Sequence, residues 1–458
     1  MRHKLLPFFL SFFIFHASCV SFVSAQPLTL EQCLDRARQN NRELCNAALD
    51  IQSANEQKKE VFTYYFPRIS ANVMAFQFFD ELVNASGNLP QEYASIAKLL
   101  SPTTNSTHFE ISEFNRAYAL SATLVQPLYF GGQIINGNKL AKVQQDVMKL
   151  KLQMTESELL QKVTECYWQL ACVRYNLNTI EAAEEMLERV QSQVNTFMEA
   201  GVTTRNSQLR VHLRQQELSS LRLKLENTDH ILLLLLAQLI GIAPEDANEN
   251  FDIVVEDRPV EEPIEMKESP LTYSPEHRVE LQLAHKAVKA QALEIKMERG
   301  KYLPHLGIGV GVYNSGLGGF SKEFRNYICP YLNNGFVFGT LSIPISDWWG
   351  GSHAIKRQKI KLKQVQNIRD DARELLQIDI ERAWSNLQEA YKQTLIAQAS
   401  CEEAAENLRI TSDQYKMSTC TLTELLDAET LDRKAQNDLS QAKANYQIAL
   451  ANYRRKII

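Results

Sequence analysis

The sequence has 458 residues, which is enough for two or three ordinary domains or for one elongated, internally repeated fold. Its 49 Lys and Arg residues stand against 54 Asp and Glu, a formal net charge of −5. Both signs are spread along the chain. So mild a balance excludes the strongly basic surface expected of a nucleic-acid-binding protein.

The first 25 residues have the pattern of a secretory signal peptide. Arg2 and Lys4 give a positive start, an apolar run follows at residues 5–15, and residues 23–25 place small side chains before a cleavage site at Gln26. We therefore predict that residues 1–25 are removed. The apolar run is too short to span a bilayer core of about 30 Å as a membrane anchor.

Two further features bear on the cellular compartment. Lipid attachment at Cys19 is an alternative to cleavage before Gln26, although His16 stands where an apolar residue is expected. The longest apolar run elsewhere, residues 231–240, is too short for a membrane helix and is interrupted by Gln238. A protein that leaves the cytoplasm without a membrane helix is either soluble in the periplasm or a membrane barrel.

Cysteine and histidine give no sign of a catalytic or metal site. Of the eight cysteines only Cys19 lies in the leader, so an odd number remains, without C-x-x-C or His-paired spacing. We predict that most of them are buried apolar fillers. The nine histidines are scattered, and no Ser-His-Asp or Cys-His arrangement is recognisable. We expect no catalytic residue, no cofactor, no bound metal and no enzymatic activity.

The sequence contains an internal repeat, in which the same motifs occur twice in the same order. The letters YYFPRI at residues 64–69 are echoed by KYLPHL at 301–306, and LVQPL at 124–128 is echoed by LSIPI at 341–345. A glycine pair follows each second motif. An ordered series of this kind indicates internal repetition. We predict a signal peptide and three parts after it: a first structural repeat at 26–242, an acidic, proline-containing linker or equatorial segment at 243–275, and a second repeat at 276–458.

Each repeat reads as helix, strand, loop, strand, long helix, turn and long helix. Apolar and small residues alternate along residues 118–124, and apolar residues alternate with glycine along 306–312. An apolar face opposite a small or polar one suits a barrel wall between lipid and water. A half-buried soluble sheet alternates in the same way. The stretches between paired strands, about 80–115 and 314–334, are predicted to be loops.

Aromatic residues and prolines gather where the predicted strands meet the helices. Tyrosine and tryptophan favour the membrane–water boundary, so we predict an interfacial belt, with a helix–sheet core as the alternative. The aromatic residues are Tyr64, Tyr65, Phe66, Tyr129, Phe130, Tyr302, Trp348 and Trp349. The prolines predicted to mark the helix–strand junctions are Pro67, Pro127, Pro304 and Pro344.

The helices after the junctions are predicted to be unusually long. Apolar residues step by four and three from Leu159 to Phe197, skipping only Glu184, which is a coiled-coil seam. From about Gly137 to Met198 the predicted helix would reach roughly 90 Å at ~1.5 Å per residue. The second half repeats the pattern over about residues 353–415. Such lengths exceed what a compact domain can use and suit a tube.

Turns are predicted at the far ends of these helices, near residues 199–204 and 417–423. In the first turn Gly201 can adopt the left-handed conformation, and Thr203 or Thr204 can cap the returning helix. Ser418 and Thr419 occupy the second turn.

These features together resemble the TolC family of outer-membrane efflux proteins over about residues 28–458. The marks that carry the resemblance are LTLEQCL at 28–34, QPLYFGG at 126–132, Gly201 at the first turn, and Tyr415 leading to LTELLDA at 422–428. Each mark alone is weak, but their order and spacing are fairly specific.

The resemblance implies a mainly α-helical fold with a β-barrel part. A long antiparallel coiled-coil α-barrel would join four strands per subunit, which complete a trimeric twelve-stranded barrel. The implied function is an outer-membrane channel of a tripartite efflux or type I secretion system in a Gram-negative bacterium, extending into the periplasm and conducting passively. The implied partners are two further copies, outer-membrane lipid, a periplasmic adaptor (membrane fusion) protein and an inner-membrane transporter, without nucleic acid.

The family's acidic constriction at the closed inner tip corresponds here to Glu424 and Asp427. Threefold symmetry would make each a ring of three carboxylates that attracts cations, and the duct would open when the helices around Gly201 and Glu424 move apart. Ordinary solvated acids near a helix N-terminus are the alternative. Ser418, Cys420 and Ser207 depart from the family pattern, so individual gating contacts are not carried over.

A soluble periplasmic coiled-coil adaptor or adhesin-like structural protein is the rival interpretation. Adaptors share long helical hairpins. They do not need paired strands with aromatic junctions written twice, which is the feature that favours the channel.

Overall fold

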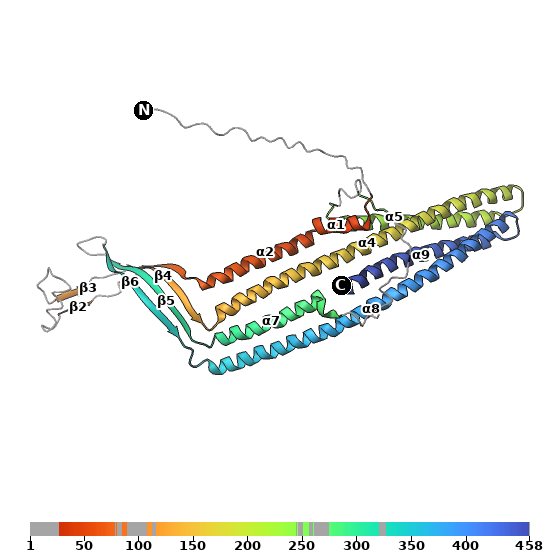
Figure 1. Ribbon diagram of the computed structural model, residues 1–458. Coiled ribbons are helices and arrows are strands. Elements are labelled where there is room, and N and C mark those ends of the chain that lie inside the picture. The colour runs from red at the N-terminus through yellow and green to blue at the C-terminus, as the bar shows by residue number, and fades with distance from the viewer. Residues whose placement is uncertain are drawn as a thin grey trace, which may run out of the picture. The chain divides into compact units, whose positions relative to one another are not determined.

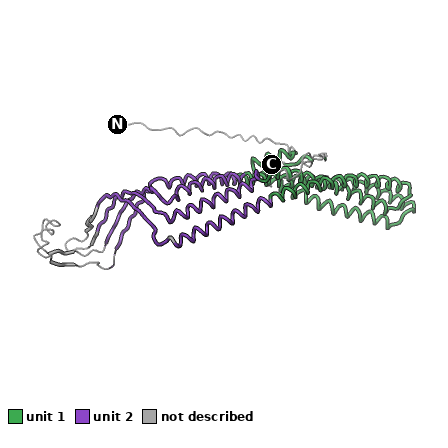
Figure 2. Tube along the Cα trace, turned by 60° about the horizontal axis from the view of Figure 1, so that its bottom comes forward, with its two compact units in different colours: residues 1–46, 153–275, 376–458 green, residues 47–152, 276–375 purple. Residues whose placement is uncertain are grey.

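The computed structural model describes residues 27–77, 79, 85–88, 108–111, 116–243, 245, 251–255, 260, 274–319 and 327–457. The predicted signal peptide and Cys19 lie outside these residues. The chain divides into two compact units, and each takes segments from both sequence halves (Figure 2). The first unit contains residues 1–46, 153–275 and 376–458, and the second contains 47–152 and 276–375.

The elements follow the repeated order predicted from the sequence (Figure 1). In the first half they are α1 (Leu30–Asn40), α2 (Arg42–Phe62), the short 3₁₀ helix η1 (Thr63–Tyr65), β1 (Arg68–Gln77), β2 (Ala85–Asn88), β3 (His108–Ile111), β4 (Arg116–Phe130), α4 (Gln133–Glu199) and α5 (Arg205–Leu239). In the second half they are η5 (Pro275–His277), α7 (Val279–Gly300), β5 (His305–Gly319), β6 (Tyr327–Ser342), α8 (Trp348–Lys416) and α9 (Leu422–Ile457).

The second unit contains a four-stranded antiparallel sheet in the order β1-β4-β5-β6. Both regions predicted as loops contain strand. A small hairpin of β2 and β3 lies within residues 80–115, and β5 and β6 extend into 314–334, where Asn314 pairs with Asn333 and Gly318 with Ile328. The segment 314–334 contains several glycines, which weaken a strand but do not prevent its ladder from continuing.

The first helix of the chain is interrupted at Asn41, which the sequence reading did not anticipate. Thr29 and Gln32 form a capping box at the start of α1. The Asn41 side chain then accepts hydrogen bonds from the backbone N–H groups of Glu43 (2.8 Å) and Leu44 (3.2 Å), which caps α2. Its Nδ2 donates to the Leu239 carbonyl at 2.8 Å, so this break also ties α5 to the amino-terminal helices.

The core of the first unit confirms the predicted coiled-coil seam of α4. Leu159, Val163, Leu170 and Val194 are all 1 % exposed or less, and Leu187 is fully buried. The skipped Glu184 lies at the margin of this seam and accepts a hydrogen bond from Arg222 of α5 at 2.7 Å. In the second hairpin, the residues at the predicted four-three spacing, Ile380, Ala383 and Leu387, are likewise buried. Helical periodicity therefore located both helix–helix interfaces correctly.

Part of the segment 243–275 is packed into the core of the first unit. Ile253 pairs with Leu28 in a parallel bridge, and both are buried. Arg174 of α4 holds the same segment, because it donates to the Ile253 carbonyl at 3.3 Å and pairs with Asp229 at 3.0 Å. The described part of this segment thus contributes to the helical core, beyond the linker role predicted for it.

Candidate channel-forming surfaces

The sheet has one aliphatic face and one mixed face. Ile69, Leu124, Val310 and Val337 are aligned in register across all four strands, and Ile69 and Val337 are 77 % and 82 % exposed. Several other exposed aliphatic residues share this face, namely Val73, Leu120, Leu306, Ile308, Val312 and Leu341. A broad exposed surface of this kind marks an interaction with lipid or protein.

The opposite face carries hydroxyl and amide groups on β1 and β4. Ser70 and Thr123 are cross-strand partners with their oxygens 2.9 Å apart, and Asn72 pairs with Ser121 in the next row. This segregation of side chains is the alternation required of a wall between lipid and water.

Both edges of this sheet are open within the described residues. β1 pairs only with β4, and β6 pairs only with β5. Unpaired backbone N–H and C=O groups along a long, flat edge form a template for another strand. One chain therefore presents two open edges, β1 on one side of the sheet and β6 on the other. Each edge is available to a further copy of the chain.

Most of the predicted interfacial aromatics are exposed at the base of the sheet. Exposure is 38 % for Tyr64 and Tyr65, 52 % for Phe66, 46 % for Tyr129, 39 % for Phe130 and 87 % for Trp349. Tyr302 is half-buried, because its ring packs against Gly351. The side chain of Trp348 lies outside the described residues. Arg68 places its guanidinium 4.6 Å from the centre of the Tyr64 ring, and the Phe130 ring stacks on His305 at 4.7 Å.

Three of the four predicted junction prolines lie between elements. Pro67 separates η1 from β1, Pro304 precedes β5, and Pro344 lies between β6 and α8. Pro127 is different, because it lies within β4 at an irregularity where the pairing register with β5 shifts. A proline cannot donate to a strand ladder, and a bulge is where a strand accommodates the missing N–H.

The tip turns lie where the sequence predicted them. Gly201 has φ +74°, and the backbone N–H of Val202 donates to the Phe197 carbonyl at 2.8 Å, which closes α4. Thr204 occupies the N-cap of α5 without a side-chain capping bond, and the Thr203 hydroxyl instead donates to Ser207 at 3.0 Å. Neither threonine therefore makes the predicted cap.

The second turn uses a non-glycine residue in the left-handed region. Ser418 has φ +59°, a backbone conformation that favours glycine. Both the backbone N–H and the hydroxyl of Thr419 donate to the Gln414 carbonyl at 2.9 Å. These two bonds close α8 and hold the turn in spite of the conformational cost at Ser418.

The two predicted aperture acids are exposed at the start of α9. The carboxylate of Glu424 accepts a hydrogen bond from the backbone N–H of Thr421 at 2.7 Å, and the Thr421 hydroxyl accepts from the Glu424 N–H at 3.3 Å. This capping box lowers the pKa of Glu424, because it stabilises the charged carboxylate. Asp427 is also exposed. Glu424 thus has a local structural role in addition to the charge it presents.

A buried ionic cluster behind the tip was missed by the sequence reading. Glu429 of α9 is 2 % exposed and accepts from Arg214 of α5 at 3.3 Å and from Arg433 at 3.2 Å. Leu422, Leu425, Glu429 and Asp432 follow four-three spacing along α9. Acids at positions where that spacing demands apolar residues were the signal that could have revealed the cluster.

Asp432 is the least satisfied member of this region. It is 8 % exposed, its Oδ2 accepts from Gln436 at 2.8 Å, and its buried Oδ1 has no hydrogen-bond partner. Burial raises the pKa of Asp432, and the charge of Glu429 acts in the same direction against the Gln436 bond. The ionised carboxylate is therefore a destabilising feature of the folded chain near neutral pH.

The Asp432→Asn variant should unfold at a higher temperature than the wild type at neutral pH. A folded-state pKa above the unfolded value means that the folded chain binds the extra proton, so the wild type gains stability as pH falls through the raised pKa. The variant should lack that gain. Circular dichroism melting at mildly acidic and neutral pH measures both, with the exposed Asp438→Asn on the same helix as control. A lower neutral-pH midpoint for Asp432→Asn would contradict the assignment.

The cysteines divide between buried and more accessible positions. Cys33, Cys166 and Cys172 are buried, as predicted for apolar fillers, whereas Cys45 is exposed and Cys401 and Cys420 are half-buried. Burial raises the pKa of the Cys33 thiol to about 12 and of Cys166 to about 11. These six cysteines are free thiols.

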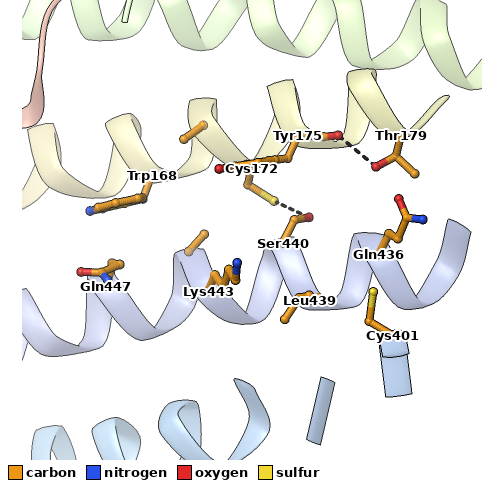
Figure 3. Close-up of a pocket in the computed structure, with 12 residues that line it drawn as sticks. Trp168, Cys172, Tyr175, Thr179, Cys401, Gln436, Leu439, Ser440, Lys443 and Gln447 are labelled. Carbon is orange, nitrogen blue, oxygen red and sulfur yellow. Dashed lines mark hydrogen bonds between the residues drawn. The ribbon is translucent and has the colours of Figure 1, made fainter. Parts of the chain in front are cut away.

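A cavity of about 200 Å³ lies in the first unit between α4 and the second hairpin (Figure 3). Cys172 points across it to Ser440, with Sγ and Oγ 3.5 Å apart, and Cys401 reaches it from α8. Its lining mixes aromatic, amide and hydroxyl groups.

Among the described residues, no group of three or more His, Cys, Asp or Glu side chains is placed to hold a metal ion. No helix in the described ranges is long and apolar enough to cross a membrane.

A repeated helix–strand plan, an exposed aliphatic sheet face and two open sheet edges define a subunit of a membrane channel. The model of the family described as outer membrane efflux protein matches residues 33–240 and 274–455, which is most of the chain. The chain therefore belongs to the outer membrane efflux protein family.

Solved structures of similar fold include the outer-membrane channels OprN and CmeC and the outer membrane protein VceC. The OprN channel has a TM-score of 0.69 at 16 % identity, covering 93 % of this chain and 89 % of its own. VceC of Vibrio cholerae has a TM-score of 0.70 at 13 % identity, and the match covers 93 % of this chain and 95 % of VceC. CmeC of Campylobacter jejuni has a TM-score of 0.71 at 14 % identity, and the match covers 93 % of this chain and 85 % of CmeC. No curated protein matches the sequence.

Membership of this family confirms the channel interpretation over the soluble adaptor. The protein is an outer-membrane channel of the tripartite efflux type in a Gram-negative bacterium, and it extends into the periplasm. It conducts passively and is not an enzyme.

Proposed function

We propose that three copies of this chain form one duct, in which β6 of each copy pairs with β1 of the next to close a twelve-stranded barrel. The observation that carries this proposal is the combination of two open edges with a single aliphatic face. Closure satisfies the edge backbone groups, which a bilayer core would otherwise leave unpaired. It also turns the aliphatic face toward lipid and the mixed face toward water.

Exposed apolar stripes on the helices of the first unit support the same assembly. Leu209, Leu213 and Leu223 of α5 are 50 %, 59 % and 67 % exposed in the single chain, and Ile378 and Ile396 of α8 are 55 % and 60 % exposed. Stripes of this size on soluble helices need a partner surface. In the proposed trimer, α5 of one copy packs beside α8 of the next.

The proposed partners act at the two ends of the duct. Outer-membrane lipid contacts the aliphatic face and the aromatic residues at the base of the sheet. A periplasmic adaptor docks at the helical tips, and an inner-membrane transporter supplies the cargo. Family membership supports these partners in general terms. The cargo that the duct receives depends on the transporter.

Electron microscopy of the detergent-extracted protein, together with reconstitution into planar bilayers, tests the duct. We expect threefold particles, and a band in sodium dodecyl sulfate that shifts only on heating, because a closed barrel has no free edge. We also expect discrete current steps. Compact monomers that wash out of the membrane and carry no current would overturn the proposal.

The second part of the proposal assigns Glu424 and Asp427 to three-membered carboxylate rings at the inner tip. Two observations support this assignment. The side chains of Glu424 and Asp427 are exposed beside the turn that ends α8, and the lowered pKa of Glu424 keeps its carboxylate ionised. Fixed negative charge at a constriction favours cations. The tip would then admit cations and resist anions until the hairpins separate.

The Glu424→Gln/Asp427→Asn variant should lose a large part of the cation preference of the channel. Gln can still accept from the Thr421 N–H, so the start of α9 is preserved while the charge is removed. Reversal potentials in a salt gradient measure the change, and we expect a shift toward zero. Glu217→Gln, an exposed acid on α5, is the matched control. An unchanged reversal potential in the double variant would count against the rings.

A further inference from the structure

The mixed face of the sheet changes character between its two halves. On β1 and β4 it carries Ser70, Asn72, Ser121 and Thr123 at the centre, with Met74 and Phe76 farther along β1. On β6 it carries Phe336 and Phe338, which face Gly311 and Gly309 of β5 in register. The ring centroids of the two phenylalanines are 5.6 Å apart, and Tyr313 of β5 is 6.1 Å from Phe336. These three rings, Tyr313, Phe336 and Phe338, are called the aromatic wall below.

The phenyl rings lie across the backbone of β5. A Cβ built on Gly309 would be 2.4 Å from the ζ carbon of Phe338, and one on Gly311 would be 2.6 Å from that of Phe336. Only glycine leaves room for rings in these positions. The alternation of glycine along β5 therefore has a specific purpose, which is to let aromatic rings from β6 spread flat over the sheet.

Phe336 keeps 40 % of its surface exposed even after this packing. The face it occupies is the one that also carries Ser70, Asn72 and Thr123, and in the proposed trimer that face lines the water-filled bore. Aromatic rings exposed to water in a bore have an unfavourable hydration cost that polar residues would avoid. Their π faces can instead bind rings and organic cations.

We propose that the aromatic wall is a weak binding surface for organic cations that carry aromatic rings, repeated three times around the bore. The proposal rests on the trimeric duct argued above. The ligand is cationic because the acids assigned to the tip select the same sign of charge, and because the π faces attract positive charge. Aromatic rings are required because offset stacking on Phe336 and Phe338 rewards them over aliphatic groups.

Block of the reconstituted channel by two cations tests the proposal. Tetraphenylphosphonium carries four rings, whereas tetrabutylammonium is a bulky monovalent cation without rings. For the wild type we expect tetraphenylphosphonium to block at a concentration about five-fold or more below that of tetrabutylammonium. Both probes carry the positive charge that a cation–π contact needs, so the difference measures ring stacking, and five-fold corresponds to about 1 kcal/mol. The Phe336→Leu/Phe338→Leu variant should bring the two blocking concentrations together.

The leucine pair keeps apolar cover over Gly309 and Gly311, so the sheet should still assemble. Val337→Ala is the matched control, because Val337 lies between the two phenylalanines on the opposite face and is 82 % exposed there. The two cations should block the Val337→Ala channel at the same concentrations as they block the wild type. Equal block of the wild type by both cations, or an unchanged preference in the leucine variant, would overturn the aromatic wall. Absence of any current in the wild type would instead overturn the duct on which it depends.

Discussion

Replacing Gly131 by Ala should sharply reduce the amount of heat-resistant oligomer. Gly131 follows β4 with φ +57°, and a Cβ there would lie 2.1 Å from the Gly300 carbonyl oxygen at the end of α7. The left-handed backbone costs a non-glycine residue about 1–2 kcal/mol, and the overlap with a backbone atom adds about 1–3 kcal/mol. The sum is a large fraction of the stability of an ordinary domain.

The second glycine pair supplies the control for this experiment. No atom lies within 4 Å of a Cβ built on Gly350, which is in the first turn of α8. Gly350→Ala should therefore leave the oligomer intact or stabilise it slightly, because alanine favours helix over glycine. The comparison is made on extracted membranes, as the fraction of oligomer that survives in sodium dodecyl sulfate with rising temperature. Equal behaviour of the two variants would show that the contact between Gly131 and Gly300 is unimportant.

The glycine pairs illustrate how much of the fold the sequence predicts. Their recurrence after the second proline motif of each repeat indicated two equivalent junctions, and the elements at both junctions follow the predicted order. The individual roles within each pair were not readable. Gly131 and Gly351 face crowded neighbours while Gly132 and Gly350 do not, because close approach depends on α7 and on Tyr302, which are far away in the sequence.

Periodic patterns were the most reliable guide, because they report burial directly. The four-three spacing from Leu159 to Phe197 and the period-two alternation of the strands both correspond to faces in the structure. Loop boundaries were less accurate. Glycine and asparagine around Asn314 and Asn333 read as loop signals, although cross-strand pairing continues beyond them. A register between strands is a non-local property that composition does not encode.

The candidate site was only partly visible in the sequence. Glu424 and Asp427 were found through family resemblance, and their aperture role stays a prediction. The cap made by Glu424 was within reach, since Thr421 and Glu424 have capping-box spacing. The pairing of Glu429 with Arg214 could not be predicted from the sequence, because Arg214 lies on another hairpin and no local pattern pairs the two residues. Contacts between elements distant in sequence define the region behind the tip, and these required the structure.

Replacing Glu429 by Gln should destabilise the helical hairpins more than any exposed charge substitution. Glu429 is 2 % exposed and balances Arg214 and Arg433, whose side chains are only 19 % and 14 % exposed. Removing the shared carboxylate leaves two poorly solvated cations. Breaking a buried pair costs about 3–5 kcal/mol, and the partial exposure of the arginines reduces this to roughly 2–4 kcal/mol. The melting temperature of the helical signal in detergent measures the loss.

The reason for keeping so costly a cluster lies in what it joins. Arg214 is on α5 and Glu429 on α9, so the pair ties the first hairpin to the second, and Arg210 adds a hydrogen bond to Thr423 nearer the tip. Glu429→Gln should therefore also open more often in bilayers, because separation of the hairpins no longer breaks an ion pair. Glu217→Ala removes an exposed partner of the same Arg214 and should cost less than about 1 kcal/mol. A Glu429→Gln channel with wild-type melting and wild-type opening would show that apolar packing alone holds the hairpins together.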